Sequence, residues 1–276
     1  MVIFPPCKIN LGLRIIRKRS DGFHDLETVF YPVLWNDALE LNRSDNPSAT
    51  LEFEQTGLPV AGDPENNICF KAWNIIKTHF PDIPGLRLQL HKNIPMGAGL
   101  GGGSADGAYT LRLINDFLQL GISKDRLHTW ALELGSDCPF FIEDGPCVAT
   151  GRGEILEPIA FSLKDYYLVL VNPGIHVNTG WAFSQLQLVP QLGLDFREII
   201  LQPIEKWQRQ LTNDFEGPVF HHYPAIGAIK NDLMNLGARY TSMSGSGSTV
   251  FGLFDQEPRL PKFLFPEEYM VKTIRL

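Results

Sequence analysis

Hydrophobic and polar residues change their spacing at several points along the chain. Leu86, Leu88 and Leu90 alternate with polar residues, which is the two-residue period of a strand with one buried face. From residue 108 to residue 118, apolar residues return every three or four positions, which is the period of an amphipathic helix. The segment between these two patterns therefore connects a predicted strand to a predicted helix that ends near Gly121.

Other segments follow one of the same two periods. Strands are predicted at residues 9–16, 29–31, 37–41, 49–53, 140–142, 168–171, 238–243 and 249–254, and helices at residues 68–80, 123–134 and 224–236. The pattern restarts with a strand near Tyr166, so we place a domain boundary near Phe161. We expect two domains, residues 1–160 and 161–276.

The segment between the strand and the helix is rich in glycine, with five glycines between residues 97 and 103. Without Cβ atoms, such a loop adopts positive φ angles and brings its backbone N–H groups close to a ligand, and the following helix adds partial positive charge. This combination favours phosphate. The residues predicted to form the phosphate loop are Pro95, Met96, Gly97, Ala98, Gly99, Leu100, Gly101, Gly102, Gly103 and Ser104.

Ser104 has two candidate roles. It is a possible N-cap of the helix, and its hydroxyl is alternatively a contact for a metal ion bound to the phosphates. A flexible turn without a ligand is the remaining interpretation of the loop. We favour it less, because each unliganded glycine costs about 0.5–1 kcal/mol in folding entropy.

Two other phosphate-binding loops share part of this pattern. Gly97, Gly99 and Gly102 have the spacing of the dinucleotide-binding fingerprint, but that motif requires a second parallel strand after its helix. Here another predicted helix follows. A Walker loop requires a lysine after its last glycine, and Ser104 follows Gly103 instead.

Composition excludes several classes of protein. With 276 residues and 44% hydrophobic residues, the chain is neither disordered nor rich in membrane spans, and no secretory signal is seen at its start. A net charge of -7 argues against nucleic acid and anionic membranes as partners. The four cysteines lack metal-binding spacing, which favours buried, reduced thiols in a cytoplasmic protein.

The glycine loop resembles the second motif of the GHMP small-molecule kinases. Four more segments extend the resemblance from residue 5 to about residue 254, namely Pro5–Leu11, in which Cys7 replaces the usual Ala, Arg19–Thr28, Gly135–Phe141 and Ser244–Ser248. The resemblance implies an α+β protein with the GHMP kinase fold. That fold joins an N-terminal domain like domain 2 of ribosomal protein S5 to a C-terminal ferredoxin-like α/β sandwich.

The longer Gly-Gly-Gly-Ser form of the loop resembles the branch of the family that acts on 4-diphosphocytidyl-2-C-methyl-D-erythritol. It implies ATP-dependent phosphorylation of the 2-hydroxyl of this cytidine diphosphate ester, with Mg²⁺, in the non-mevalonate route to isoprenoids. It also implies a cytoplasmic monomer or weak homodimer. A GHMP kinase for mevalonate, homoserine or a sugar stays open, as does a non-catalytic binding protein on this fold.

The resemblance also implies roles at the reacting groups. Asp137 would be the base that accepts the proton of the substrate hydroxyl, although the residues alone favour a turn former. Lys8 would stabilise the transferring phosphoryl group, and Asn10 would face the substrate. The alternative for Lys8 is a solvated surface lysine. Ser104 would contact the metal ion.

Two groups of residues are implied for the two nucleotides. Phe23 and Phe183 would stack on the cytosine, His24 would hydrogen-bond its edge, and Thr179 would lie beside them; Phe23 stands where the family usually has Tyr. A structural histidine and a packed Phe183 are the alternatives. Asn66, Asn67 and Lys92 would border the adenine and ribose of ATP, and a helix cap is the alternative for the Asn pair.

Overall fold

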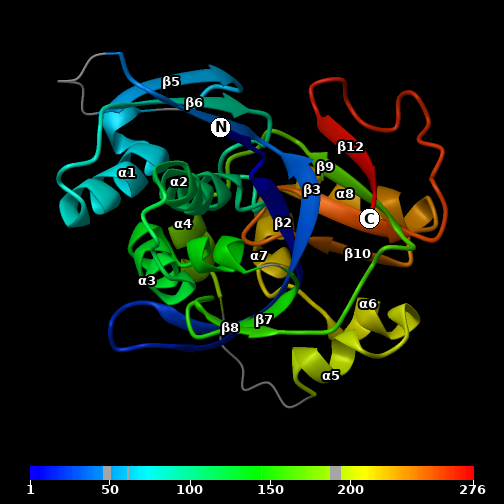
Figure 1. Cartoon of the computed structure of the whole chain (residues 1–276). Coiled ribbons are helices and arrows are strands. Elements are labelled where there is room, and N and C mark those ends of the chain that lie inside the picture. The colour runs from blue at the N-terminus through cyan, green and yellow to red at the C-terminus, as the bar shows by residue number, and fades with distance from the viewer. Residues whose placement is uncertain (46–50, 61, 144, 187–193) are drawn as a thin grey trace. The chain divides into compact units, whose positions relative to one another are not determined.

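The computed structural model of the chain describes residues 1–45, 51–60, 62–143, 145–186 and 194–276. The chain, whose elements are labelled in Figure 1, forms two compact units, and each is built from three separate segments of the sequence. The first unit contains Met1–Cys7, Trp35–Met96 and Gly101–Asp144, and the second contains Lys8–Leu34, Gly97–Leu100 and Gly145–Leu276. The predicted domain boundary at residue 160 follows chain order, and it stays a prediction.

The first unit has one four-stranded sheet. Its strands lie in the order β1 (Val2–Ile3), β4 (Ala38–Arg43), β6 (Leu86–Lys92) and β5 (Leu51–Gly57). Strand β4 is antiparallel to β6, and β5 is parallel to it. The alternation that predicted β6 is confirmed, since Leu86, Leu88 and Leu90 are buried. The side chain of Lys92 lies on the same buried face of β6.

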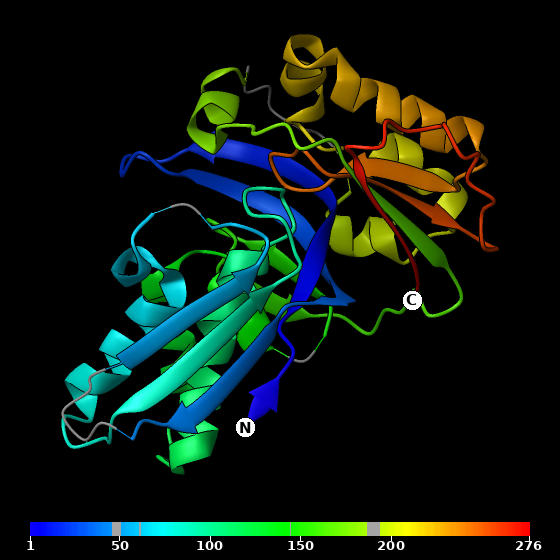
Figure 2. The same ribbon diagram turned by 90° about the horizontal axis from the view of Figure 1, so that it is seen from above.

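Three helices cover one face of this sheet, as Figure 2 shows in cyan to green. They are α1 (Ile68–His79), α2 (Gly102–Leu118) and α3 (Lys124–Leu134), and two 3₁₀ helices accompany them, η1 (Pro64–Asn66) and η2 (Cys138–Ile142). Asn67 caps α1 by accepting a hydrogen bond from the Cys69 N–H, and Ser123 caps α3 in the same way. The helix that follows α2 is α3, so the second parallel strand of a dinucleotide-binding motif is missing there.

The second unit has two four-stranded sheets. One has the order β2 (Pro6–Lys18), β3 (His24–Asn36), β7 (Cys147–Thr150) and β8 (Ile155–Pro158). The other has the order β10 (Tyr240–Met243), β11 (Val250–Phe254), β9 (Tyr167–Asn172) and β12 (Met270–Arg275). Numbered from β9, the second order is 2-3-1-4, which is the strand order of a ferredoxin-like sheet.

Helices of the second unit bury the apolar face of the β9 to β12 sheet. Helices α7 (Glu216–His222) and α8 (Pro224–Asn235), in gold in Figure 2, lie along it. Val169, Ile226 and Leu233 are part of one buried cluster between these layers. The remaining helices of this unit are α4 (Thr179–Ser184), α5 (Phe196–Ile200), η3 (Ile204–Lys206) and α6 (Trp207–Gln210).

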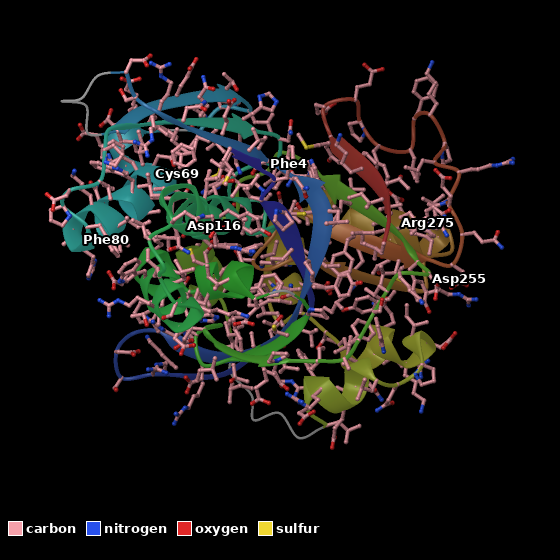
Figure 3. All side chains as sticks on the ribbon, in the orientation of Figure 1. Phe4, Cys69, Phe80, Asp116, Asp255 and Arg275 are labelled. Carbon is pink, nitrogen blue, oxygen red and sulfur yellow. The ribbon has the colours of Figure 1, made fainter. Side chains whose placement is uncertain are left out.

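The sheets and helices confirm the α+β class, and the free, buried state of all four cysteines is confirmed as well. Cys69, labelled in Figure 3, lies on α1. None of the helices in the described part of the chain has the length and apolar composition needed to cross a bilayer.

Two local predictions need correction, and a third can be checked only in part. Residues 140–142 form a 3₁₀ helix in place of a strand, because Pro139 fixes a helical φ and cannot donate to a sheet. Helix α2 begins at Gly102, so Ser104 is its third residue and Gly101 is the N-cap. The strand predicted at residues 49–53 is observed from Leu51, and its first two residues lie outside the described ranges.

Candidate active site

The start of the glycine loop, Gly97–Leu100, is fixed in the second unit by a turn of small residues. Gly99 has a φ of +78°, and a Cβ atom there would lie 1.9 Å from the carbonyl oxygen of Ser244. The Ser244 hydroxyl donates to the Gly99 carbonyl at 2.8 Å, and the Thr249 N–H donates to the Ala98 carbonyl at 3.2 Å. The loop can approach this closely only because Gly99 has no side chain.

Asn213 holds the turn that faces the loop. Its amide Nδ2 donates to the carbonyl oxygens of Met243 and Gly245 at 2.7 and 2.8 Å, and its Oδ1 accepts from the Phe215 N–H at 3.0 Å. The side chain is buried. The segment Ser244–Ser248, one of those that carry the resemblance, therefore supports the start of the loop.

Lys8 and Asn10 lie beside the same loop, on β2. The ammonium of Lys8 donates to Asn10 Oδ1 at 2.6 Å and to the Gly99 carbonyl at 3.3 Å. It also lies 4.9 Å from the centre of the Phe30 ring. Lys8 is only 3% exposed, so the alternative of a solvated surface lysine is wrong. Asn10 is oriented by Thr28, whose hydroxyl accepts from its Nδ2 at 2.9 Å.

The rest of the loop lies in the first unit, where it forms the wall of a pocket of about 620 Å³. Asn66, Asn67, Met96, Gly103 and Ser104 all line it, together with apolar residues of the sheet and α1 (Phe53, Leu90, Ile68). Apolar walls with a few converging polar groups are typical of a small-molecule site, and the volume suits a nucleotide. The structure thus brings the predicted Asn66–Asn67 pair and the glycine loop to one cavity.

The start of α2 supplies the polar end of this pocket. Gly101 caps the helix with a φ of +67°, a backbone conformation that glycine adopts without strain. The N–H groups of the first turn, including those of Gly103 and Ser104, have no carbonyl partner within the helix. Because the helix dipole adds positive charge here, this end of the pocket favours an anion.

Asp137 lies in the same unit as α2. It precedes η2, which packs against α2. Burial raises the pKa of the adjacent Cys138 thiol to about 12, and the Ser104 hydroxyl beside that thiol opposes the rise. Ser104 therefore lies beside Cys138, the residue that follows Asp137.

Behind the pocket, Lys92 joins two carboxyl groups that the sequence did not reveal. Its ammonium donates to Asp37 and, at 2.8 Å, to Asp106 of α2. Asp37 also accepts from the N–H groups of Asn93 and Ile94 at 2.5 and 2.8 Å. The side chain of Lys92 is fully buried, so the expectation that it borders the nucleotide needs correction. It joins α2 to β6 and to Asp37, the residue before β4, instead.

This buried cluster of Asp37, Lys92 and Asp106 has an unequal number of acidic and basic groups. Burial raises the pKa of Asp106 to about 8, although the charge of Lys92 opposes the rise, and Asp37 adds to it. Burial alone would lower the pKa of Lys92, but the charges of Asp106 and Asp37 outweigh it and raise that pKa. One lysine between two carboxyl groups thus favours a proton on Asp106 near neutral pH.

The residues predicted to hold the cytosine gather in the second unit. The rings of His24 and Phe183 are stacked at 4.5 Å, and Phe183 meets Phe215 edge-on at 4.9 Å. Thr179 forms a hydroxyl–hydroxyl hydrogen bond with Ser246 at 2.9 Å. Phe23 is half exposed at the tip between β2 and β3. Phe183 is therefore packed against Phe215, in agreement with the alternative of a packed Phe183. Its ring also stacks on His24.

The surroundings of His24 favour its neutral form. Burial lowers its pKa, and the positive charge of Lys18 adds to the effect. A neutral imidazole has one donor and one acceptor nitrogen, which suits the edge of a base.

Comparison with protein-family models finds two matches. Residues 67–145 match the GHMP kinases N terminal domain, and residues 196–264 match the GHMP kinases C terminal domain. A 4-diphosphocytidyl-2-C-methyl-D-erythritol kinase of Parabacteroides distasonis is 49% identical over 93% of this chain and 92% of its own length. The enzyme of the same name from Cytophaga hutchinsonii is 42% identical over 94% of each chain.

Solved structures give the same result. A 4-(cytidine 5'-diphospho)-2C-methyl-D-erythritol kinase superposes with a TM-score of 0.78 and 31% identity, over 92% of this chain and 90% of that one. A homoserine kinase of Cytophaga hutchinsonii has a TM-score of 0.70 at 18% identity, over 93% and 85%, and shows the fold alone. The predicted GHMP kinase fold is confirmed, and the chain belongs to the 4-diphosphocytidyl-2-C-methyl-D-erythritol kinases of the GHMP kinase family.

Proposed function

We propose that this protein transfers the γ-phosphoryl group of ATP to the 2-hydroxyl of 4-diphosphocytidyl-2-C-methyl-D-erythritol, in the non-mevalonate route to isoprenoids. The observation that supports this best is the pocket of the first unit, which is lined by Asn66, by the helix-capping Asn67, and by Gly103 and Ser104. Its apolar walls suit an adenine, and the start of α2 suits phosphate. We assign the acceptor substrate from the names of the similar kinases.

The residues have separate roles in this proposal. Backbone N–H groups of the loop bind and orient the phosphates, and Lys8 stabilises the charge on the group in transfer. Asp137 accepts the proton of the acceptor hydroxyl. Asn10 orients the substrate. The neutral His24 hydrogen-bonds the cytosine edge, with Phe23, Thr179 and Phe183 around the base.

A magnesium ion would need phosphate oxygens of ATP as ligands in addition to the protein oxygens of this site. Among the described residues, no group of three His, Cys, Asp or Glu side chains is arranged to hold a metal ion. Mg²⁺ in kinases is usually held by one or two protein oxygens and by phosphate oxygens. The Ser104 hydroxyl, at the phosphate end of the pocket, would be such a contact, and the ion would offset the phosphate charge.

We also propose that the enzyme acts in the cytoplasm as a monomer or weak homodimer, with small molecules as its only substrates and without nucleic-acid or membrane partners. The net charge of -7 supports the last point, because anionic polymers and bilayers are bound by basic surfaces.

A coupled assay of ADP release tests the function. The purified protein is supplied with ATP, Mg²⁺ and, separately, the cytidine substrate, mevalonate and homoserine. We expect ADP release only with the cytidine substrate, and inhibition by free CMP or CDP. Turnover of mevalonate or homoserine alone would overturn the substrate but keep the kinase class. ADP release with none of the three would overturn the function.

A further inference from the structure

The guanidinium of Arg152 lies over the ring of Phe23, with its Cζ atom 4.6 Å from the ring centre. Arg152 is in the turn between β7 and β8, whereas Phe23 is at the tip between β2 and β3, so this contact joins two separate hairpins of the second unit. A cation over an aromatic face is attracted by the negative charge of that face. Phe23 is nevertheless 51% exposed, which leaves much of its ring open to a ligand.

The position of Arg152 is itself fixed. Its backbone N–H donates to Glu154 Oε2 at 2.5 Å, and its Nε lies 3.5 Å from Glu154 Oε1. The carbonyl of Gly151 accepts from the N–H of Leu26 on β3 at 2.7 Å, which ties the turn to that strand. The φ of +69° at Gly151 favours glycine in this turn.

The hydrogen bonds at Phe23 hold its backbone. Its N–H donates to Asp21 Oδ1 at 3.1 Å, and its carbonyl accepts from the Arg19 N–H at 2.8 Å. The half-exposed ring takes no part in these hydrogen bonds. When a ligand stacks on a mobile ring, the ring loses conformational entropy. This loss lowers the affinity for the ligand. A guanidinium that already covers one face removes part of this cost and directs the ligand to the other face.

We propose that Arg152 is a positioning residue for the substrate, which holds the ring of Phe23 ready to stack on the pyrimidine of the cytidine diphosphate ester. This proposal rests on the proposed function. A phenyl ring, like the ring of the usual Tyr, offers the face that the guanidinium requires. Arg152 acts through Phe23 and does not need to touch the substrate.

A double-mutant cycle tests the proposal with the full-length enzyme. The KM for the cytidine substrate and the inhibition constant of CMP are measured for the wild type, Arg152→Met, Phe23→Leu and the double variant. We expect Arg152→Met to raise both constants about three- to tenfold while the KM for ATP changes by less than about twofold. In the Phe23→Leu background, the same substitution should change them by less than about twofold.

Two further variants complete the test. Arg152→Lys keeps the cation and should recover part of the affinity, and Arg152→Gln replaces Arg152→Met if thermal unfolding shows that the latter is misfolded. Arg126→Met is the matched control, because Arg126 is an exposed arginine 5.2 Å from the ring centre of Trp130 on α3. It removes the same kind of contact and should leave the KM for the cytidine substrate unchanged.

The outcomes separate this proposal from the proposed function. An unchanged KM in Arg152→Met, with an active wild type, would overturn only the role of Arg152. An equal loss of affinity with and without Phe23 would also overturn it, because Arg152 would then contact the substrate directly. A wild type that does not turn over the cytidine substrate would instead overturn the proposed function.

Discussion

The Cα atom of Gly99 faces the carbonyl oxygen of Ser244 so closely that a Cβ atom on Gly99 would lie 1.9 Å from it. The two residues are 145 positions apart, and the hydroxyl of Ser244 returns a hydrogen bond to the Gly99 carbonyl at 2.8 Å. This contact fixes the start of the glycine loop in the second unit, beside Lys8 and Asn10.

Gly99→Ala should therefore damage both the fold and the loop. We expect a loss in the free energy of unfolding of about 3 kcal/mol or more, since steric overlap adds to the about 1–2 kcal/mol cost of a non-glycine residue at positive φ. Urea denaturation measures it. Gly121→Ala is the matched control, because Gly121 has a φ of +69° and nothing within 4 Å of its Cβ position. Equal losses in both variants would contradict the steric account.

Lys92→Met tests the buried cluster behind the nucleotide pocket. Removing the one lysine leaves Asp37 and Asp106 buried without a cation, and breaking a buried ion pair in this way costs about 3–5 kcal/mol. We expect a loss of that size in urea denaturation at pH 7. The exposed Lys71 on α1 provides the control, and Lys71→Met should change the free energy of unfolding by less than about 0.5 kcal/mol. If Lys92→Met also lowered the free energy of unfolding by less than about 0.5 kcal/mol, the ion pairs of this cluster would not stabilise the fold.

The pH dependence of stability tests the protonation of Asp106. Its folded pKa is raised from 3.8 to about 8, so the folded protein keeps a proton that the unfolded chain loses above pH 4. Unfolding then releases a proton, and the free energy of unfolding falls as the pH rises from about 4 to about 8. Asp106→Asn removes this dependence. The stability of the wild type relative to Asp106→Asn should fall by at least about 1 kcal/mol between pH 5 and pH 8. A relative stability that rises with pH would mean that the carboxyl pKa is lowered.

Local pattern predicted much of the fold. The alternation of Leu86, Leu88 and Leu90 predicted β6, and Asn67 and Ser123 cap the helices that follow them, because these signals depend on neighbours in sequence. Pro139 gave a local signal that was overlooked, and the apolar residues after it were interpreted as a strand.

Contacts over long sequence separations were not predictable in the same way. Lys92 lies in the buried phase of β6, which indicates a buried partner, but nothing local identifies Asp37, 55 positions away, as that partner. Asn213, which holds the Ser244 turn, and Arg152, which covers Phe23, were missed as contacts for the same reason. The resemblance to a family supplied the roles of Lys8 and Asp137, and these roles stay predictions.

Turnover by an Asp137→Asn variant is the most direct test of the central claim, that Asp137 takes the proton of the acceptor hydroxyl during transfer from ATP. The variant is compared with the wild type for ADP release with the cytidine substrate, and its binding of ATP and of CMP is measured by calorimetry. Our account predicts dissociation constants within about threefold of the wild type and a kcat at least about 100-fold lower. A kcat within about tenfold of the wild type, with both ligands bound, would contradict it.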